Sequence, residues 1–251
     1  MEKRDINEQL IKELEDIYNN NGYGGEPIYD GPSNWNSYEN SSPKIVFLAK
    51  ESHGSYHPAN ERIIDDRFTK IIGIWASIIN SGLQNGVDKC DFSRETIQRF
   101  YSSVAIVEVK KIDTDSSRSS DTDLKKMTWL GRELLKQQME LLTPDIVVCL
   151  GTIEYFDIIN NYSEEERNAK EKQIDVGENR RCWNSNGTII IDSYHPSYWT
   201  LTEERLCEIF KNLFSNQNLI NECLQVIKQK KINNQCPNSA TSPVTSPSSK
   251  S

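Results

Sequence analysis

The 251-residue chain is poor in the residues that build metal centres and membrane anchors. It has only three histidines, and its six cysteines form no C-x-x-C pair and no zinc-finger spacing, so we expect buried free thiols, no metal and no cofactor. No apolar run approaches the roughly 20 residues that a membrane helix requires. The charged N-terminus has no apolar segment behind it, so no signal peptide is expected. We therefore predict a cytoplasmic protein without a membrane partner.

An excess of positive charge is also absent. The chain has 29 lysines and arginines against 37 aspartates and glutamates, a net charge of −8. This balance argues against nonspecific nucleic-acid binding over the whole surface, although basic residues do cluster locally between residues 110 and 126. With 36% hydrophobic and 26% charged residues, the composition is that of a globular protein, and we expect a monomer.

Apolar runs of strand length alternate with segments of helical periodicity. The predicted strands are 44–49, 103–109, 145–150 and a hairpin over 180–193 that turns at Asn186-Gly187. The predicted helices are 4–20, 61–81, 123–142, 152–161, one that begins with a capping box at Thr200 and Glu203, and 219–231. Such alternation favours βαβ units. We expect one α/β domain over residues 1–232, with three layers (α/β/α) around a short, mostly parallel, four-stranded sheet. Residues 233–251 are Ser/Pro-rich and are predicted to form a disordered tail.

Two of the three histidines lie in polar turns that directly follow predicted buried strands. His53 belongs to residues 50–54 (KESHG), and His195 belongs to residues 194–197 (YHPS). Ligands of open α/β proteins bind at the carboxyl ends of the strands, where such loops converge. The two turns are therefore predicted to form two walls of one active site. The alternative is that they are unrelated surface turns.

The order of these elements resembles the uracil-DNA glycosylase superfamily over residues 44–215. That family has one active-site loop after its first strand and another after its last. Its first motif occurs in variants such as Gly-Gln-Asp-Pro-Tyr-His and Gly-Glu-Ala-Pro-Gly, and residues 50–54 match the second variant at Glu51 and Gly54. Its second motif, His-Pro-Ser, is intact at residues 195–197.

Between the two motifs the family has a strand that ends in an Asn-x-x-Lys pattern. The corresponding stretch here is 108–111, in which Lys111 matches and Glu108 departs. The four-cysteine pattern of the iron–sulfur cluster found in some relatives is missing. The resemblance implies a short parallel sheet and a pocket for a flipped base.

The second motif carries most of the implied chemistry. By direct match, His195 would donate a hydrogen bond to a base oxygen as negative charge develops there; the alternative is a histidine that caps a turn. Pro196 would hold the turn, and Ser197 would contact a backbone phosphate. Tyr198 and Trp199 are large enough to wedge into a duplex, or they are core aromatics.

Three residues of the first motif are candidates for the side chain that positions or activates water. The family often has Asp or Asn at the third position of the first motif, whereas this chain has Ser52, which can orient a water molecule but cannot take its proton. Glu51 is the nearest carboxylate and a candidate base, or it braces the loop by accepting backbone N–H bonds. His53 is a further candidate base or nucleophile. With Tyr56 and His57, it could form the second wall of the base pocket.

Residues 108–123 hold the predicted determinant of substrate choice and two of the predicted DNA contacts. An ionised Glu108 can only accept hydrogen bonds, so it should favour a base with an amino donor, such as cytosine or a modified cytosine, over uracil. Alternatively, it pairs with Lys110 or Lys111. Lys111, and Arg118 in the serine-rich loop 113–123, are predicted phosphate contacts. The alternative for the loop is a plain flexible connection.

Two functions remain open at this point. One is a metal-free DNA glycosylase of unusual base specificity, which hydrolyses the N-glycosidic bond of a flipped nucleotide in single- or double-stranded DNA. The other is a binding module on the same fold that recognises nucleic acid, a nucleotide or a modified base without hydrolysis. A serine hydrolase of the α/β type is disfavoured because the chain contains no Gly-x-Ser-x-Gly motif.

Overall fold

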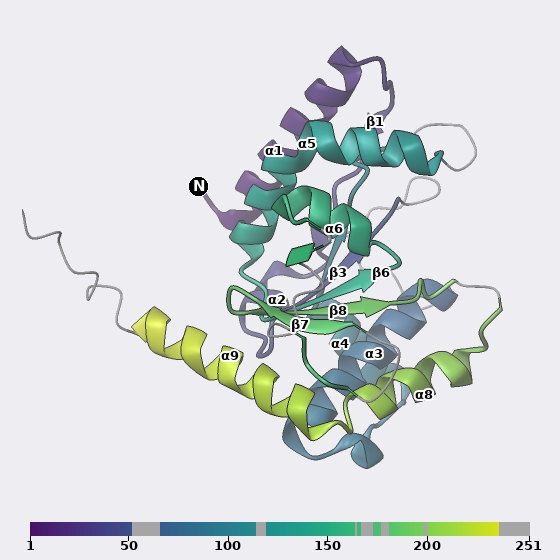
Figure 1. The fold of residues 1–251 in the computed structure, drawn as a ribbon, viewed down its shortest axis with the longest axis vertical. Coiled ribbons are helices and arrows are strands. Elements are labelled where there is room, and N and C mark those ends of the chain that lie inside the picture. The colour runs from purple at the N-terminus through teal and green to yellow at the C-terminus, as the bar shows by residue number, and fades with distance from the viewer. Residues whose placement is uncertain are drawn as a thin grey trace, which may run out of the picture.

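The computed structural model describes residues 1–51, 66–113, 119–163, 165–166, 173–176, 181–197 and 200–235. A mixed six-stranded sheet with the strand order β2-β4-β3-β6-β8-β7 lies at its centre (Figure 1). Its strands are β2 (Gly31–Pro32), β3 (Ile45–Ala49), β4 (Ala105–Glu108), β6 (Ile146–Leu150), β7 (Cys182–Ser185) and β8 (Thr188–Ser193). The inner strands β4, β3, β6 and β8 are parallel, and the two edge strands are antiparallel.

The prediction of a four-stranded sheet is therefore wrong, because the two antiparallel edge strands bring the number to six. One edge strand, β7, is the first arm of the predicted hairpin, and its two-residue turn has positive φ at Asn186 (50°) and Gly187 (81°). The other edge strand, β2, was not predicted, because two residues that include a proline show no strand pattern. A separate small sheet pairs β1 (Glu26–Pro27) with β5 (Ile112–Asp113).

Helices cover both faces of the central sheet. One face carries α3 (Arg67–Gln84), α4 (Arg94–Ser102), α8 (Glu203–Leu213) and α9 (Gln217–Gln235), and the other carries α1 (Lys3–Asn20), α5 (Asp121–Leu142) and α6 (Ile153–Asn160). Alternate residues of β3 point to the two faces: Phe47 packs in the first core, and Val46 and Leu48 pack in the second. Burial on both faces explains why the inner strands are continuous apolar runs.

Two shorter helical segments complete the described elements. They are α2 (Trp35–Glu39) and the 3₁₀ turn η1 (Val87–Lys89). No helix in the described ranges is long and apolar enough to cross a membrane.

Side-chain caps set the starts of the main helices. Asp66 accepts from the backbone N–H of Thr69 at the start of α3, and Ser120 accepts from Asp123 at the start of α5. The predicted cap at Thr200 is wrong, because Thr202 accepts the backbone N–H of Arg205 and begins α8.

The last helix is longer than the sequence pattern indicated. Helix α9 continues to Gln235, three residues into the segment predicted to be a tail. The remainder of that segment, 236–251, lies outside the described residues.

Candidate functional site

The carboxyl ends of the inner strands bring together the residues that follow them. Beyond the ends of β3 and β4 the ladder continues for two more hydrogen bonds, from Val109 N to Ala49 O (3.0 Å) and from Lys110 N to Lys50 O (3.1 Å). The two strands therefore deliver polar side chains side by side at this edge of the sheet. We call it the carboxyl edge.

Glu51 lies at this edge with both carboxylate oxygens occupied. One oxygen is 3.1 Å from the ammonium of Lys110, and the two side chains are 6% and 5% exposed. The other oxygen accepts the backbone N–H of Ser119 at 3.1 Å. The carboxylate thus ties the end of β3 to the end of β4 and to the segment before α5. This geometry fits the bracing role of Glu51 better than the role of a general base, which needs a free lone pair facing water.

Asp121 forms a second tie at the same edge. Its Oδ1 accepts a hydrogen bond from the Tyr155 hydroxyl at 2.5 Å and lies 3.4 Å from the ammonium of Lys50. The Tyr155 hydrogen bond holds the pKa of Asp121 below its usual value, and burial raises the pKa of Tyr155. Sequence reasoning counted Asp121 only as part of a loop, because its partners are contributed by other elements.

Lys111 is buried rather than exposed to a phosphate. Its ammonium donates to Asp30 Oδ2, and both side chains are 0% exposed. Burial lowers the pKa of Lys111, while the Asp30 carboxylate opposes that shift. The prediction that Lys111 contacts a backbone phosphate is therefore corrected: the side chain is a structural cation inside the protein.

Neutral side chains complete the surroundings of Asp30. Gln138 Nε2 donates to Asp30 Oδ1 at 2.7 Å and to Asn7 Oδ1 at 2.9 Å, and Asn7 Nδ2 donates to the Asp30 carbonyl at 2.8 Å. The network joins α1, α5 and the segment before β2. The sequence held one signal for it: Asn7 shares its helix face with the apolar residues Leu10 and Leu14, where a polar residue needs a buried partner.

Glu108 lies at the end of β4 and is 3% exposed. Its backbone N–H donates to Asp30 Oδ2 at 2.5 Å. Strand alternation puts its side chain on the same face as Ile106, toward α3 and α4. Its negative charge also acts to raise the pKa of Lys111, because it stabilises the protonated ammonium. This electrostatic effect on Lys111 agrees in direction with the pairing that the sequence offered as the alternative to base recognition.

His195 is held in one orientation by its own turn. Its Nδ1 accepts the backbone N–H of Ser197 at 3.1 Å, and its ring lies 5.5 Å from the ring of Phe68 at the start of α3. A backbone N–H can only donate, so the neutral imidazole carries its proton on Nε2. Pro196 is buried and Ser197 is exposed. His195 lies two residues after the end of β8, in the turn that was predicted to follow this strand.

The remaining predicted site residues lie outside the described ranges. They are Ser52, His53, Tyr56, His57, Arg118, Tyr198 and Trp199. Among the residues that the structure describes, no three His, Cys, Asp or Glu side chains form a group that could hold a metal ion. A comparison of the chain with protein-family models and with curated proteins finds no match.

Proposed function

We propose that this protein is a DNA glycosylase-like enzyme that binds a flipped nucleotide base at its carboxyl edge and hydrolyses the N-glycosidic bond. The layout supports this proposal. Four inner strands are parallel, and the His53 and His195 loops follow the first strand, β3, and the last, β8, as in the uracil-DNA glycosylase family. The finer assignment of a uracil-DNA glycosylase-like three-layer fold is part of the same proposal.

The observation that carries the proposal is the fixed tautomer of His195. When the bond between C1′ and the base nitrogen breaks, the electron pair leaves with the base, and negative charge grows on a base oxygen. A water oxygen bonds to C1′, and a proton from that water ends on the departing base. The Nε2–H of His195 is oriented by the bond that Nδ1 accepts from Ser197. A preoriented donor of this kind stabilises the developing charge without reorganising during the reaction.

Glu108 is the proposed selector of the base. Its buried carboxylate lies at the end of β4, and two strand ends, those of β3 and β6, separate it from the end of β8. A ligand that reaches both Glu108 and His195 must cross those two strand ends. An ionised carboxylate prefers a base that presents an amino group, so cytosine or a modified cytosine is the proposed target.

A second candidate function is base binding without hydrolysis. The observation that favours it is the engagement of both Glu51 oxygens by Lys110 and the backbone of Ser119. In that case the edge would recognise a nucleotide, a modified base or a nucleic-acid end, and His195 would serve as a recognition donor.

The experiment uses the full chain and labelled single- and double-stranded oligonucleotides that contain cytosine, 5-methylcytosine or uracil. Abasic sites are scored after alkaline cleavage, and binding is measured in parallel. We expect abasic product from a cytosine-type base, reduced about 100-fold or more in His195→Ala. The matched control is Lys228→Ala, an exposed position on α9 that should leave the rate unchanged. The Glu108→Asn variant should shift preference toward uracil.

Each outcome has a distinct meaning. Binding that depends on His195 without abasic product would replace the enzyme proposal with the binding module. Neither product nor binding on any oligonucleotide would overturn both candidates. Unchanged base preference in Glu108→Asn would overturn the role proposed for that carboxylate alone.

A further inference from the structure

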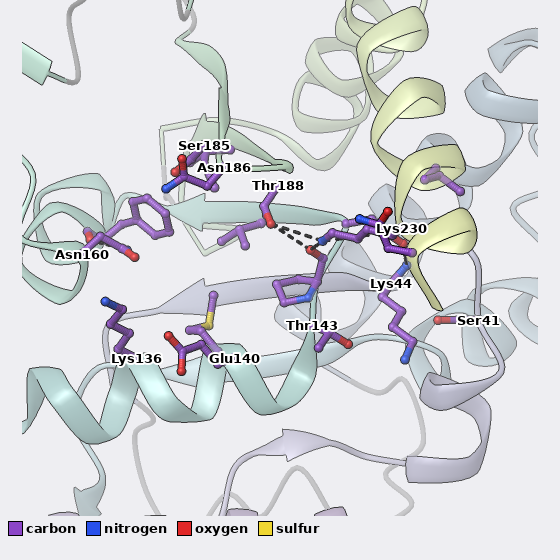
Figure 2. Close-up of a pocket in the computed structure, with 18 of the residues that line it drawn as sticks. Ser41, Lys44, Lys136, Glu140, Thr143, Asn160, Ser185, Asn186, Thr188 and Lys230 are labelled. Atoms are coloured by element: carbon purple, nitrogen blue, oxygen red, sulfur yellow. Dashed lines mark hydrogen bonds and ion pairs between the residues drawn. The ribbon is translucent and has the colours of Figure 1, made fainter. Parts of the chain in front are cut away.

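A cavity lies at the opposite edge of the sheet from the proposed base site. Its volume is about 750 Å³, and it opens where β6 and β8 begin, between α5 and α9 (Figure 2). Three of its lining residues mark this position: Lys44 precedes β3, Asp145 precedes β6, and Thr188 is the first residue of β8. We call it the amino-edge cavity, and none of the residues placed in the base site lines it.

The floor of the amino-edge cavity is apolar. Val147 of β6 and Ile190 of β8 are register partners in the parallel ladder, so they lie side by side. Phe156 of α6 and Met139 of α5 add an aromatic ring and a thioether to the lining. A floor of this composition favours a flat apolar group that displaces water.

The rim of the cavity is rich in lysines. Four lysines and three carboxylates line it, which leaves one positive charge in excess on a chain whose net charge is −8. The lining lysines are Lys44, Lys136, Lys230 and Lys231, and the carboxylates are Glu39, Glu140 and Asp145. The local excess of positive charge is complementary to an anionic ligand.

Two of these lysines are already held by protein acceptors. Lys44 is 3.1 Å from Glu39 Oε2. Lys230 donates to the Pro144 carbonyl and, at 3.3 Å, to Thr188 Oγ1, as the dashed lines in Figure 2 show.

Lys136 differs from them. Its side chain extends from α5 at the end of the cavity far from Lys44 and Lys230, on the side of Asn160 in Figure 2. It has no hydrogen-bond or ion-pair partner within the described ranges. Its ammonium is therefore available to a ligand, as is that of Lys231, which likewise has no such partner among the described residues.

We propose that the amino-edge cavity binds a small organic anion with a flat apolar body and one carboxylate, sulfonate or phosphate group. The apolar body lies over Val147 and Ile190, and the anionic group pairs with Lys136. This site is independent of the base site, since its residues lie at the other end of the strands.

The probe for this proposal is 8-anilinonaphthalene-1-sulfonate, an aromatic anion whose fluorescence rises in apolar surroundings. We expect saturable binding of one molecule per chain. The charge reversal Lys136→Glu should weaken binding at least about 10-fold, equivalent to about 1.4 kcal/mol. The matched control is Lys228→Glu, the same reversal at an exposed position of α9 that does not line the cavity, and it should change affinity less than about 2-fold.

A second arm tests the anionic group itself. The neutral analogue N-phenyl-1-naphthylamine should bind more weakly than the sulfonate, and Lys136→Glu should not affect its binding. Equal weakening by the two charge reversals, equal affinity for the neutral analogue, or binding that does not saturate would each overturn the proposal. Far-ultraviolet circular dichroism checks that the variants are folded, and unchanged oligonucleotide activity in Lys136→Glu would separate this site from the base site.

Discussion

Lys111 donates to Asp30 in the interior of the protein, and neither side chain has any exposed surface. The pair joins the segment after β4 to the segment before β2. A buried ion pair is favourable only where further hydrogen bonds satisfy the remaining polar atoms. Gln138 and the backbone of Glu108 supply two of those bonds to Asp30. The carboxyl edge therefore rests on a buried polar network, in which Gln138 Oε1 has no hydrogen-bond partner among the described residues.

Removing one partner of this pair should destabilise the folded protein. We expect Lys111→Met to lower the free energy of unfolding by about 3–5 kcal/mol, because it leaves the Asp30 carboxylate buried without its cation. Urea denaturation measures the change. Lys126→Met, at an exposed position on α5, is the matched control and should change stability by less than about 0.5 kcal/mol. Equal effects of the two substitutions would contradict the structural role.

The bracing role of Glu51 can be separated from a role as general base. The double variant Glu51→Gln with Lys110→Gln keeps a neutral hydrogen-bonded pair at the carboxyl edge and removes the carboxylate. If Glu51 is a brace, the proposed base excision, measured in a single turnover, should stay within about 10-fold of the wild-type rate. Loss of a general base would reduce the rate by about 10²–10⁴-fold. Glu51→Gln alone should destabilise the chain more than the double variant does, since it removes the carboxylate that pairs with the buried Lys110 ammonium and keeps the lysine.

The tautomer of His195 is directly measurable. Nitrogen-15 spectra of the side chain should show the proton on Nε2 and an unprotonated Nδ1, because Nδ1 accepts the backbone N–H of Ser197. The His195→Gln variant assigns the resonances. A proton on Nδ1 in the neutral ring would contradict both this geometry and the donor role proposed for Nε2.

Asp121 should make stability depend on pH in the acidic range. Its pKa in the folded chain lies below the usual 3.8, chiefly because of the Tyr155 hydrogen bond, so the unfolded chain binds more protons in that window. The stabilisation is fully present above pH 3.8 and is lost as the pH falls through the folded-state pKa. Because the carboxylate is 56% exposed, we expect Asp121→Asn to cost less than about 1 kcal/mol near neutral pH.

The measurement is urea denaturation of the wild type and of Asp121→Asn at about pH 6 and at about pH 2. The difference in free energy of unfolding should shrink at the lower pH. A double-mutant cycle of Asp121→Asn with Tyr155→Phe isolates the hydrogen bond between the two side chains. A coupling energy that does not fall as the pH is lowered would contradict the role assigned to this hydrogen bond.

Gly73 marks the close contact between α3 and α4. A Cβ at this position would lie 2.7 Å from the carbonyl oxygen of Ile97 and 2.6 Å from its Cγ2. We expect Gly73→Ala to destabilise the chain by about 1–3 kcal/mol, despite the better helix propensity of alanine. Gly24→Ala, where a Cβ meets nothing within 4 Å, is the control. Thermal or urea denaturation compares the two, and a stabilised Gly73→Ala variant would contradict the predicted clash.

Local patterns predicted the elements that bury a continuous or periodic apolar surface. The runs at 44–49 and 145–150 are β3 and β6, and the helices predicted at 4–20 and 123–142 are α1 and α5. Strand β2 and helix α4 were missed. The first pairs only through its backbone, and the second buries just one aliphatic and one aromatic side chain, Ile97 and Tyr101, so neither leaves a strong pattern in the sequence.

The sequence by itself determined which residues end the strands, because strand length and the polar residues that follow are local properties. It thereby put Glu51, Lys111 and His195 at the carboxyl edge. Only the tertiary structure decided what each side chain does there. The partner of Lys111 is Asp30, 81 residues away, and the partner of Glu51 is Lys110, 59 residues away. Such pairings depend on which strands become neighbours. Once a charged side chain is buried, it must pair with a counter-charge, because an unpaired buried charge is strongly destabilising.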